Sequence, residues 1–153
     1  MRLQGKTALV TGGTDGIGLE VARQLKERGA IVAVCGRDPG RLTSAKDAGV
    51  QAIAADLSTR EGCDRLVEEL RGVALDVLVN NAGRGGPSDL LNGFDLDETD
   101  RAVYLNLNAP MRLIAAFLPT LRARPEAAIV NVTSGLAIAP RAADRQDADH
   151  HAC

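Results

Sequence analysis

Short apolar runs alternate with amphipathic stretches along most of this chain, and that alternation restricts its fold more than any other feature. The apolar runs predict about five strands, at residues 7–10, 30–37, 50–56, 75–80 and 127–134. The stretches between them have the length and periodicity of helices, so each strand is followed by a crossover to a parallel neighbour. Such crossovers are right-handed and build a doubly wound α/β fold. We expect a parallel sheet with the strand order 3-2-1-4-5.

Residue types at the helix ends indicate where the helices start and stop. Gly29 ends a first helix that begins near Ile17. Asp38 is the expected N-cap of a second helix, because an aspartate side chain accepts a hydrogen bond from the first helical turn. By the same argument, Ser58 is the expected N-cap of a third helix, which runs to Arg71.

A longer helix is expected from about Glu98 to Arg122, after a loop at residues 81–97 that is rich in Gly, Asn and Asp. The apolar side chains of this helix do not fit on a single stripe. Because a helix that is apolar all round is usually buried all round, we expect it to be covered on every side.

Length and charge limit the class of protein. With 153 residues the chain has room for one domain, which we place at residues 1–140. Residues 141–153 are polar and are expected to form a disordered tail. The formal net charge of -2 provides no basic surface for nucleic acid, so a small-molecule partner is expected.

Cellular location and metal binding can also be predicted. The N-terminus reaches glycine too early for a signal peptide, and no apolar run approaches the roughly 18 residues that a membrane span needs. Cys35, Cys63 and Cys153 lack the spacing of a zinc site or a disulfide framework, and His150 and His151 lie in the polar tail. We therefore expect reduced thiols, no metal site, no membrane contact and a cytoplasmic location.

Four glycines lie between the first predicted strand and the first predicted helix, in the stretch ALVTGGTDGIGLEVA. They are Gly12, Gly13, Gly16 and Gly18. Glycine allows a tight turn and a close approach of the backbone, and the helix N-terminus offers unpaired N–H groups with a partial positive charge. A glycine motif alone is weak evidence, but a strand, a glycine loop and a helix in this order predict a binding site for a dinucleotide pyrophosphate.

The spacing Gly-x-x-x-Gly-x-Gly, together with the sequence NNAG at Asn80 to Gly83, resembles the short-chain dehydrogenase/reductase family. The resemblance covers residues 5 to about 140. It implies a Rossmann-like domain that binds a nicotinamide dinucleotide, and hydride transfer between the nicotinamide and a carbonyl or alcohol substrate. The residues that it implies for cofactor binding are Thr11, Gly12, Gly16, Ile17, Gly18, Arg37, Asp56, Asn80, Asn81, Ala82 and Gly83.

The end of the second strand is expected to select between NADP and NAD. An acidic side chain there binds the ribose hydroxyls of NAD, whereas an arginine accommodates the extra phosphate of NADP. Gly36 followed by Arg37 therefore predicts NADP, with NAD as the alternative, although Asp15 adds a negative charge to the glycine loop. The resemblance implies that Asp56 meets the adenine amino group.

The resemblance also implies a catalytic set of asparagine, serine, tyrosine and lysine. Asn106 in YLNLNAP and Ser134 in VNVTSG match the first two. The other two are expected after Ser134 as Tyr-x-x-x-Lys, but the chain has a single tyrosine, Tyr104, and no lysine after Lys46. Tyr104 is expected to point away from Asn106. The 153 residues are therefore predicted to be catalytically incomplete.

Two interpretations stay open. In the first, the protein is an oxidoreductase of this family whose domain is incomplete, through truncation or a frameshift after Arg141. In the second, it is a non-enzymatic module that binds a dinucleotide or another protein. In both, the fifth strand would have an open edge and the long helix an uncovered apolar face. We therefore expect a homo-oligomer or an association-prone chain.

Overall fold

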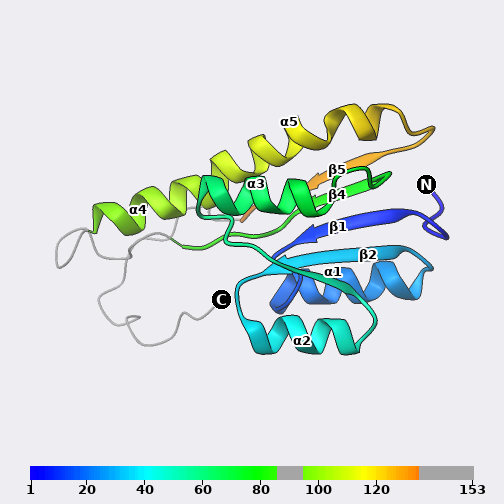
Figure 1. Ribbon diagram of the computed structural model, residues 1–153, viewed down its shortest axis with the longest axis horizontal. Coiled ribbons are helices and arrows are strands. Elements are labelled where there is room, and N and C mark those ends of the chain that lie inside the picture. Colours follow the sequence, from blue (N-terminus) through cyan, green and yellow to red (C-terminus); the bar gives the residue numbers. More distant parts are fainter. Residues whose placement is uncertain (86–94, 135–153) are drawn as a thin grey trace.

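A computed structural model describes residues 1–85 and 95–134 of the protein (Figure 1). Five parallel strands form one sheet in the order β3-β2-β1-β4-β5, which confirms the predicted fold class and strand order. Their bounds are β1 Thr7–Thr11, β2 Ile31–Gly36, β3 Gln51–Ala54, β4 Val77–Asn80 and β5 Ala128–Asn131. The predicted domain end at residue 140 and the predicted tail at 141–153 lie outside the described residues.

Helices cover both faces of the sheet. Their bounds are α1 Gly16–Glu27, α2 Pro39–Asp47, α3 Arg60–Glu69, α4 Leu96–Val103 and α5 Ala109–Arg122, with a π-helical segment, η1, at Tyr104–Asn108 between α4 and α5. Figure 1 shows α3 and α5 side by side on one side of the sheet and α1 and α2 on the other. No helix among the described residues is long and apolar enough to span a membrane.

The core has two halves because side chains of a strand point alternately to opposite faces of the sheet. Leu9 and Leu78 belong to the half that packs under α3 and α5, where Phe117 is also buried. Val10 and Val34 belong to the half that packs against α1 and α2. The central strands β1 and β4 are therefore buried on both sides, as their uninterrupted apolar sequences predict.

One of the two predicted helix caps is confirmed and the other is wrong. The Asp38 side chain accepts a hydrogen bond from the Arg41 N–H at 2.8 Å, as expected of an N-cap. At α3 the N-cap is Thr59, whose hydroxyl accepts a hydrogen bond from the Gly62 N–H at 3.1 Å. Ser58 donates instead to the Asp56 carboxylate from its N–H and its hydroxyl, because that carboxylate lies directly after β3.

The long helix differs from its prediction in two ways. It begins at Leu96, where the Asp95 side chain accepts a hydrogen bond from the Glu98 N–H at 3.1 Å, and it contains the π-helical segment η1. It is also not covered on every side within the part of the chain that the structure describes, so the expectation of complete burial is wrong, whereas the expected uncovered apolar face is present. The sheet and α3 bury one side of it, and the opposite side exposes Val103 (50%), Leu107 (55%), Met111 (62%) and Leu118 (40%).

A buried carboxylate joins three segments at the amino ends of the strands. The side chain of Asp76 is 1% exposed and accepts hydrogen bonds from the Thr7 N–H at 2.9 Å and from Arg124 Nε at 2.8 Å. Lys6 Nζ lies 3.4 Å from the same carboxylate. The backbone carbonyl of Asp76 accepts a hydrogen bond from Ala128, so Asp76 connects the starts of β1, β4 and β5.

Candidate nucleotide-binding site

The glycine loop lies where the carboxyl end of β1 meets the N-terminus of α1. Gly12 and Gly16 have φ angles of 63° and 50°, a backbone conformation that favours glycine. A Cβ at Gly12 would also come within 3.0 Å of the Ala82 backbone, whereas a Cβ at Gly16 would meet nothing within 4 Å. The loop is thus packed on its inner side, against the segment after β4, and is open at Gly16.

Gly18 brings the first turn of α1 close to this loop. A Cβ at Gly18 would overlap the carbonyl oxygen of Gly12 and the side-chain amide of Asn81. Asp15, at the N-cap position of α1, has an extended backbone and makes no side-chain hydrogen bond to the helix. The first N–H groups of α1 therefore lack a capping side chain, and a helix N-terminus in this state attracts an anion.

Hydrogen bonds fix the end of β1 to the segment after β4. The buried Thr11 hydroxyl accepts hydrogen bonds from the N–H groups of Asn81 (2.9 Å) and Ala82 (3.0 Å) and donates to the Val79 carbonyl at 3.3 Å. The Asn81 side-chain amide donates to the Thr11 carbonyl at 3.0 Å. The one donor and both acceptor positions of the Thr11 hydroxyl are occupied, so none is left for a ligand. Thr11 and Asn81 therefore hold the glycine loop against the segment after β4.

The end of β2 is a glycine that lies against the Thr14 side chain. A Cβ at Gly36 would overlap the hydroxyl of Thr14, which lies over this position from the glycine loop. Arg37 follows, exposed, with its guanidinium 3.7 Å from the Asp56 carboxylate. Burial by itself raises the pKa of Asp56, but its hydrogen bonds from Ser58 and the charge of Arg37 outweigh burial and lower that pKa. A negative charge at Asp56 therefore faces the positive charge of Arg37.

Asp15 and Arg41 form an ion pair between the glycine loop and the first turn of α2. Sequence reasoning noted the negative charge of Asp15 but did not identify Arg41 as its partner. Nothing in the local sequence of α2 indicates this contact, because it depends on how the loop and the helix are placed next to each other in the fold. Sequence reasoning missed Thr14 for the same reason.

Asn106 holds the loop after β4 through both polar atoms of its side chain. Its Oδ1 accepts a hydrogen bond from the Arg84 N–H at 3.0 Å, and its Nδ2 donates to the Arg84 carbonyl at 2.8 Å. An ion pair between Arg84 and Glu98 of α4 adds a second connection. Asn106 lies in η1, where the N–H of Ala109 donates to the Tyr104 carbonyl five residues earlier. A single π turn of this kind is frequent at functional sites.

The other predicted site residues occupy different positions. Ser134 is exposed and follows β5 at the carboxyl edge of the sheet, and Ile17 is exposed in the first turn of α1. Asn80 ends β4 and donates a hydrogen bond to the Asn131 side chain at 2.8 Å, which ties β4 to β5. Tyr104 lies instead against the core beneath α3 and α5. Burial there is the main cause that raises the pKa of its hydroxyl, and the nearby Cys63 is the second.

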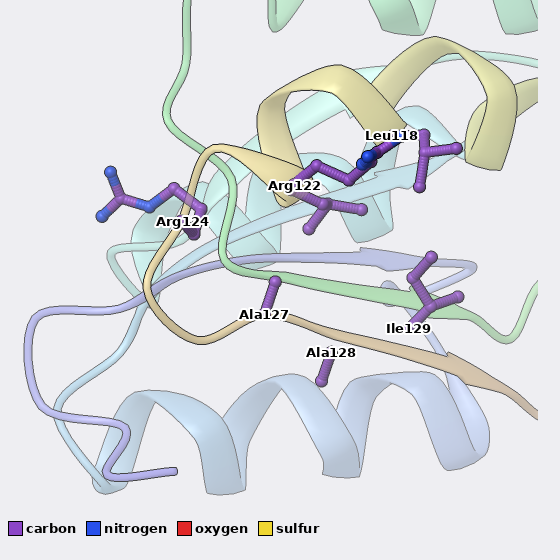
Figure 2. A pocket seen from close by; sticks show the side chains of 7 residues that line it. Leu118, Arg122, Arg124, Ala127, Ala128 and Ile129 are labelled. Carbon is purple, nitrogen blue, oxygen red and sulfur yellow. The ribbon is translucent and has the colours of Figure 1, made fainter.

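A hollow also lies at the opposite edge of the sheet from the glycine loop. It is an open groove of about 360 Å³ between α5 and the start of β5. Figure 2 shows Leu118 and Arg122 on α5, Ala127 and Ile129 along the strand segment, and Arg124 on the connection between them. The groove has no glycine loop and no helix N-terminus, so the nucleotide-binding features all belong to the carboxyl edge.

The comparisons with known proteins identify the family. A sequence model of the family described as short chain dehydrogenase matches residues 6–144. The chain belongs to this family. It is similar to the uncharacterized oxidoreductase DltE of Bacillus subtilis, with 43% identity over 149 residues, 93% of this chain and 58% of DltE. The chain therefore spans a little over half the length of this short-chain dehydrogenase relative.

Solved structures of the same family resemble the fold closely. The Pseudomonas aeruginosa RhlG/NADP complex matches 92% of this chain and 59% of its own, with 36% identity and a TM-score of 0.79. The L-sorbose reductase of Gluconobacter frateurii, solved with NADPH and L-sorbose, matches 92% of this chain and 57% of its own, with 31% identity and a TM-score of 0.80. The predicted family and its Rossmann-like fold are confirmed.

Proposed function

We propose that this chain binds NADP(H) and forms the cofactor-binding part of an oxidoreductase that acts on a small carbonyl or alcohol substrate. One observation carries the proposal: the glycine loop is packed against Ala82 and Asn81 on its inner side, is open at Gly16, and lies beside an α1 N-terminus without a side-chain cap. This geometry fits a pyrophosphate, since the backbone can approach the anion without a Cβ in the way.

The remaining cofactor residues have distinct proposed roles. Gly12, Gly16, Ile17 and Gly18 hold the pyrophosphate, and Thr11 keeps the loop in shape. Asn80, Asn81, Ala82 and Gly83 form the wall for the adenosine, with Asp56 near the adenine and Arg37 near the ribose phosphate. When bound, the nicotinamide supplies or accepts a hydride. No group of His, Cys, Asp or Glu among the described residues could hold a metal ion, and none is proposed.

The choice of NADP over NAD is supported at the end of β2. β2 ends at Gly36, which Thr14 lies over, so this position carries no acidic side chain to bind ribose hydroxyls. The exposed guanidinium of Arg37 can pair with a phosphate through charge-assisted hydrogen bonds. The solved complexes of the Pseudomonas and Gluconobacter proteins with NADP and NADPH further support this choice.

Catalysis by these 153 residues alone is proposed to be incomplete. Ser134, exposed after β5, is proposed to orient a substrate carbonyl, and the Asn106 side chain positions the loop after β4 through Arg84. Neither side chain can donate a proton near neutral pH as a tuned phenol can. The chain has no Tyr-x-x-x-Lys sequence, and Tyr104 is partly buried against the core cluster with a raised pKa. The alternative of a purely non-enzymatic module finds no support in the relatives, which are named as oxidoreductases and reductases.

Association and a cytoplasmic location are further parts of the proposal. The apolar side of α5 and the edge strand β5 expose Met111, Leu118 and Val130, which favours a homo-oligomer or an association-prone chain. Cys35 and Cys63 are buried free thiols, as is usual in the reducing cytoplasm.

A titration with NADPH and NADH tests the proposal. The chain is expected to bind NADPH more tightly than NADH, and Arg37→Glu is expected to reverse this preference because a carboxylate repels the ribose phosphate. Arg71→Glu, a similar charge reversal at the exposed end of α3, is the control and should leave the preference unchanged. Equal affinities of the unchanged chain for the two dinucleotides would contradict the NADP assignment.

A further inference from the structure

We infer that Arg41 is a second residue that selects NADP(H), and that it binds the ribose phosphate by exchanging Asp15 for that phosphate. This inference rests on the proposed function. It starts from the ion pair between the Arg41 guanidinium and the Asp15 carboxylate, which joins residues 26 positions apart in the chain. The pair connects the glycine loop, where the pyrophosphate would lie, with the first turn of α2, beside the end of β2.

Asp15 is an unfavourable residue for an anion site unless its charge is balanced. It occupies the N-cap position of α1, but its side chain makes no capping hydrogen bond and is 62% exposed. A carboxylate beside a phosphate raises the free energy of binding through like-charge repulsion. Arg41 is the cation that pairs with Asp15, so the glycine loop carries little net charge before a nucleotide arrives.

The ion pair can open at little cost. Both side chains are more than half exposed, and exposed ion pairs contribute little to stability, so breaking this one lowers affinity by a factor of about five or less. The backbone of Arg41 stays in place, because its N–H donates to the Asp38 cap at 2.8 Å. Only the side chain has to turn. A phosphate offers the guanidinium a doubly charged acceptor with two or more oxygens, which is a stronger partner than a single exposed carboxylate.

Arg37 and Arg41 then act on the same group. They lie on either side of the turn that leads from β2 into α2, and each is paired with one exposed carboxylate, Asp56 and Asp15 respectively. Only NADP(H) carries a phosphate on the adenosine ribose, so the exchange favours NADP(H) and leaves NAD(H) almost unaffected. Asp15 opposes this exchange, because its negative charge holds Arg41 and repels the phosphates of NADP(H).

A double-mutant cycle on the full chain tests the exchange. The variants are Asp15→Asn, Arg41→Gln and the pair together, and the readout is the dissociation constant for NADPH and for NADH by calorimetric titration. Arg41→Gln is expected to weaken NADPH binding about tenfold. It should weaken NADH binding by a smaller factor, about fivefold or less, because the unpaired Asp15 then repels the pyrophosphate that both dinucleotides carry. Asp15→Asn is expected to tighten NADPH binding by about three- to tenfold, because Arg41 is released and a like charge is removed.

The deciding comparison is Arg41→Gln in the Asp15→Asn background. If Arg41 binds the phosphate directly, the NADPH dissociation constant still rises about tenfold there. If Arg41 only neutralises Asp15, the loss of Arg41 has no effect in that background, and the inference is wrong. Arg71→Gln removes one positive charge far from the glycine loop and should leave both constants unchanged. All of these side chains are exposed, and circular dichroism verifies that each variant is folded.

The outcomes separate this inference from the proposed function. If the unchanged chain binds neither dinucleotide, the proposed function fails and the inference fails with it. If it binds NADPH and Arg41→Gln changes nothing, only the inference fails. If Arg41→Gln weakens NADPH and NADH equally, Arg41 acts on the pyrophosphate that both share, and its role in selection is refuted.

Discussion

Replacing Asp76 with alanine should destabilise the fold by about 3–5 kcal/mol, the range for removing one partner of a buried ion pair. The Asp76 carboxylate is 1% exposed and accepts hydrogen bonds from the Thr7 N–H and from Arg124 Nε, with Lys6 Nζ at 3.4 Å. These contacts fix the amino ends of β1 and β4 and the connection that leads into β5. The substitution therefore removes the link between three segments that are far apart in the sequence.

The magnitude follows from the separate contacts. Leaving the Thr7 N–H without a partner costs about 1–3 kcal/mol, and a hydrogen bond to a charged group such as Arg124 contributes about 1.5–3 kcal/mol. Lys6 adds little, because its Nζ lies 3.4 Å from the carboxylate, farther than Arg124 Nε. For a chain of this length, each kcal/mol shifts the melting temperature by roughly 2–4 °C. The expected decrease is about 12 °C, taking the middle of both ranges.

The effect should depend on pH in a defined direction. Burial raises the pKa of Asp76, but the hydrogen bonds from Thr7, Arg124 and Lys6 outweigh burial and hold that pKa below its ordinary value of 3.8. A carboxyl with a lowered pKa in the folded state stabilises the fold above the unfolded value, and this contribution is lost as the pH falls through the folded value. The difference in unfolding free energy between the unchanged chain and Asp76→Ala should therefore be constant near neutral pH and shrink below pH 3.8.

Thermal and urea unfolding followed by circular dichroism measure this difference. Asp64→Ala is the matched control, because its carboxylate pairs with Arg112 at 2.8 Å but is 57% exposed. An exposed pair is worth about 1 kcal/mol or less, so Asp64→Ala should barely change the melting temperature. If Asp76→Ala and Asp64→Ala lower the stability equally, the buried carboxylate does not hold the three segments together as argued.

Two further predictions concern association and turnover. The chain should form oligomers or aggregates through the apolar side of α5. The double variant Met111→Glu, Leu118→Glu should raise the monomer fraction measured by size-exclusion chromatography with light scattering. A monomer of the unchanged chain that melts cooperatively would contradict this. Oxidation of NADPH with generic ketones or aldehydes should stay near background, because the loss of a positioned general acid typically lowers the rate by about 10²- to 10⁴-fold. Robust turnover that Ser134→Ala or Tyr104→Phe abolishes would show that another acid exists.

The sequence predicted the features that depend on periodicity and on short motifs. The alternation of strands and helices, the Asp38 cap and the glycine loop follow from residues that are close together in the chain, and the expected strand order rests on the doubly wound topology that this alternation predicts. The sequence pattern predicts Ser58 as the cap of α3, whereas the structure has Thr59. The pattern does not show that the Ser58 hydroxyl donates to the Asp56 carboxylate and that Thr59 accepts from the first turn of the helix. Capping residues one position apart are therefore distinguished only by their neighbours in space.

Contacts between distant segments could not be predicted from the sequence. The pairing of Arg41 with Asp15 and the two hydrogen bonds between Asn106 and the Arg84 backbone depend on side-chain directions that only the packed fold defines. The sequence predicts that the long helix has an uncovered apolar face, but not which of its side chains lie on that face. An apolar sequence shows that a helix surface is suited to burial, but not which segment covers it.

Hydrogen–deuterium exchange of the full chain, with and without saturating NADPH, tests the central claim most directly. The account predicts slower exchange of backbone amides in residues 11–18, 35–41 and 80–84, where the glycine loop, the end of β2 and the segment after β4 meet. The groove between α5 and β5 should show no change. Protection confined to residues 118–129, or no protection anywhere at a concentration that saturates binding, would contradict the assignment of the carboxyl edge of the sheet as the dinucleotide site.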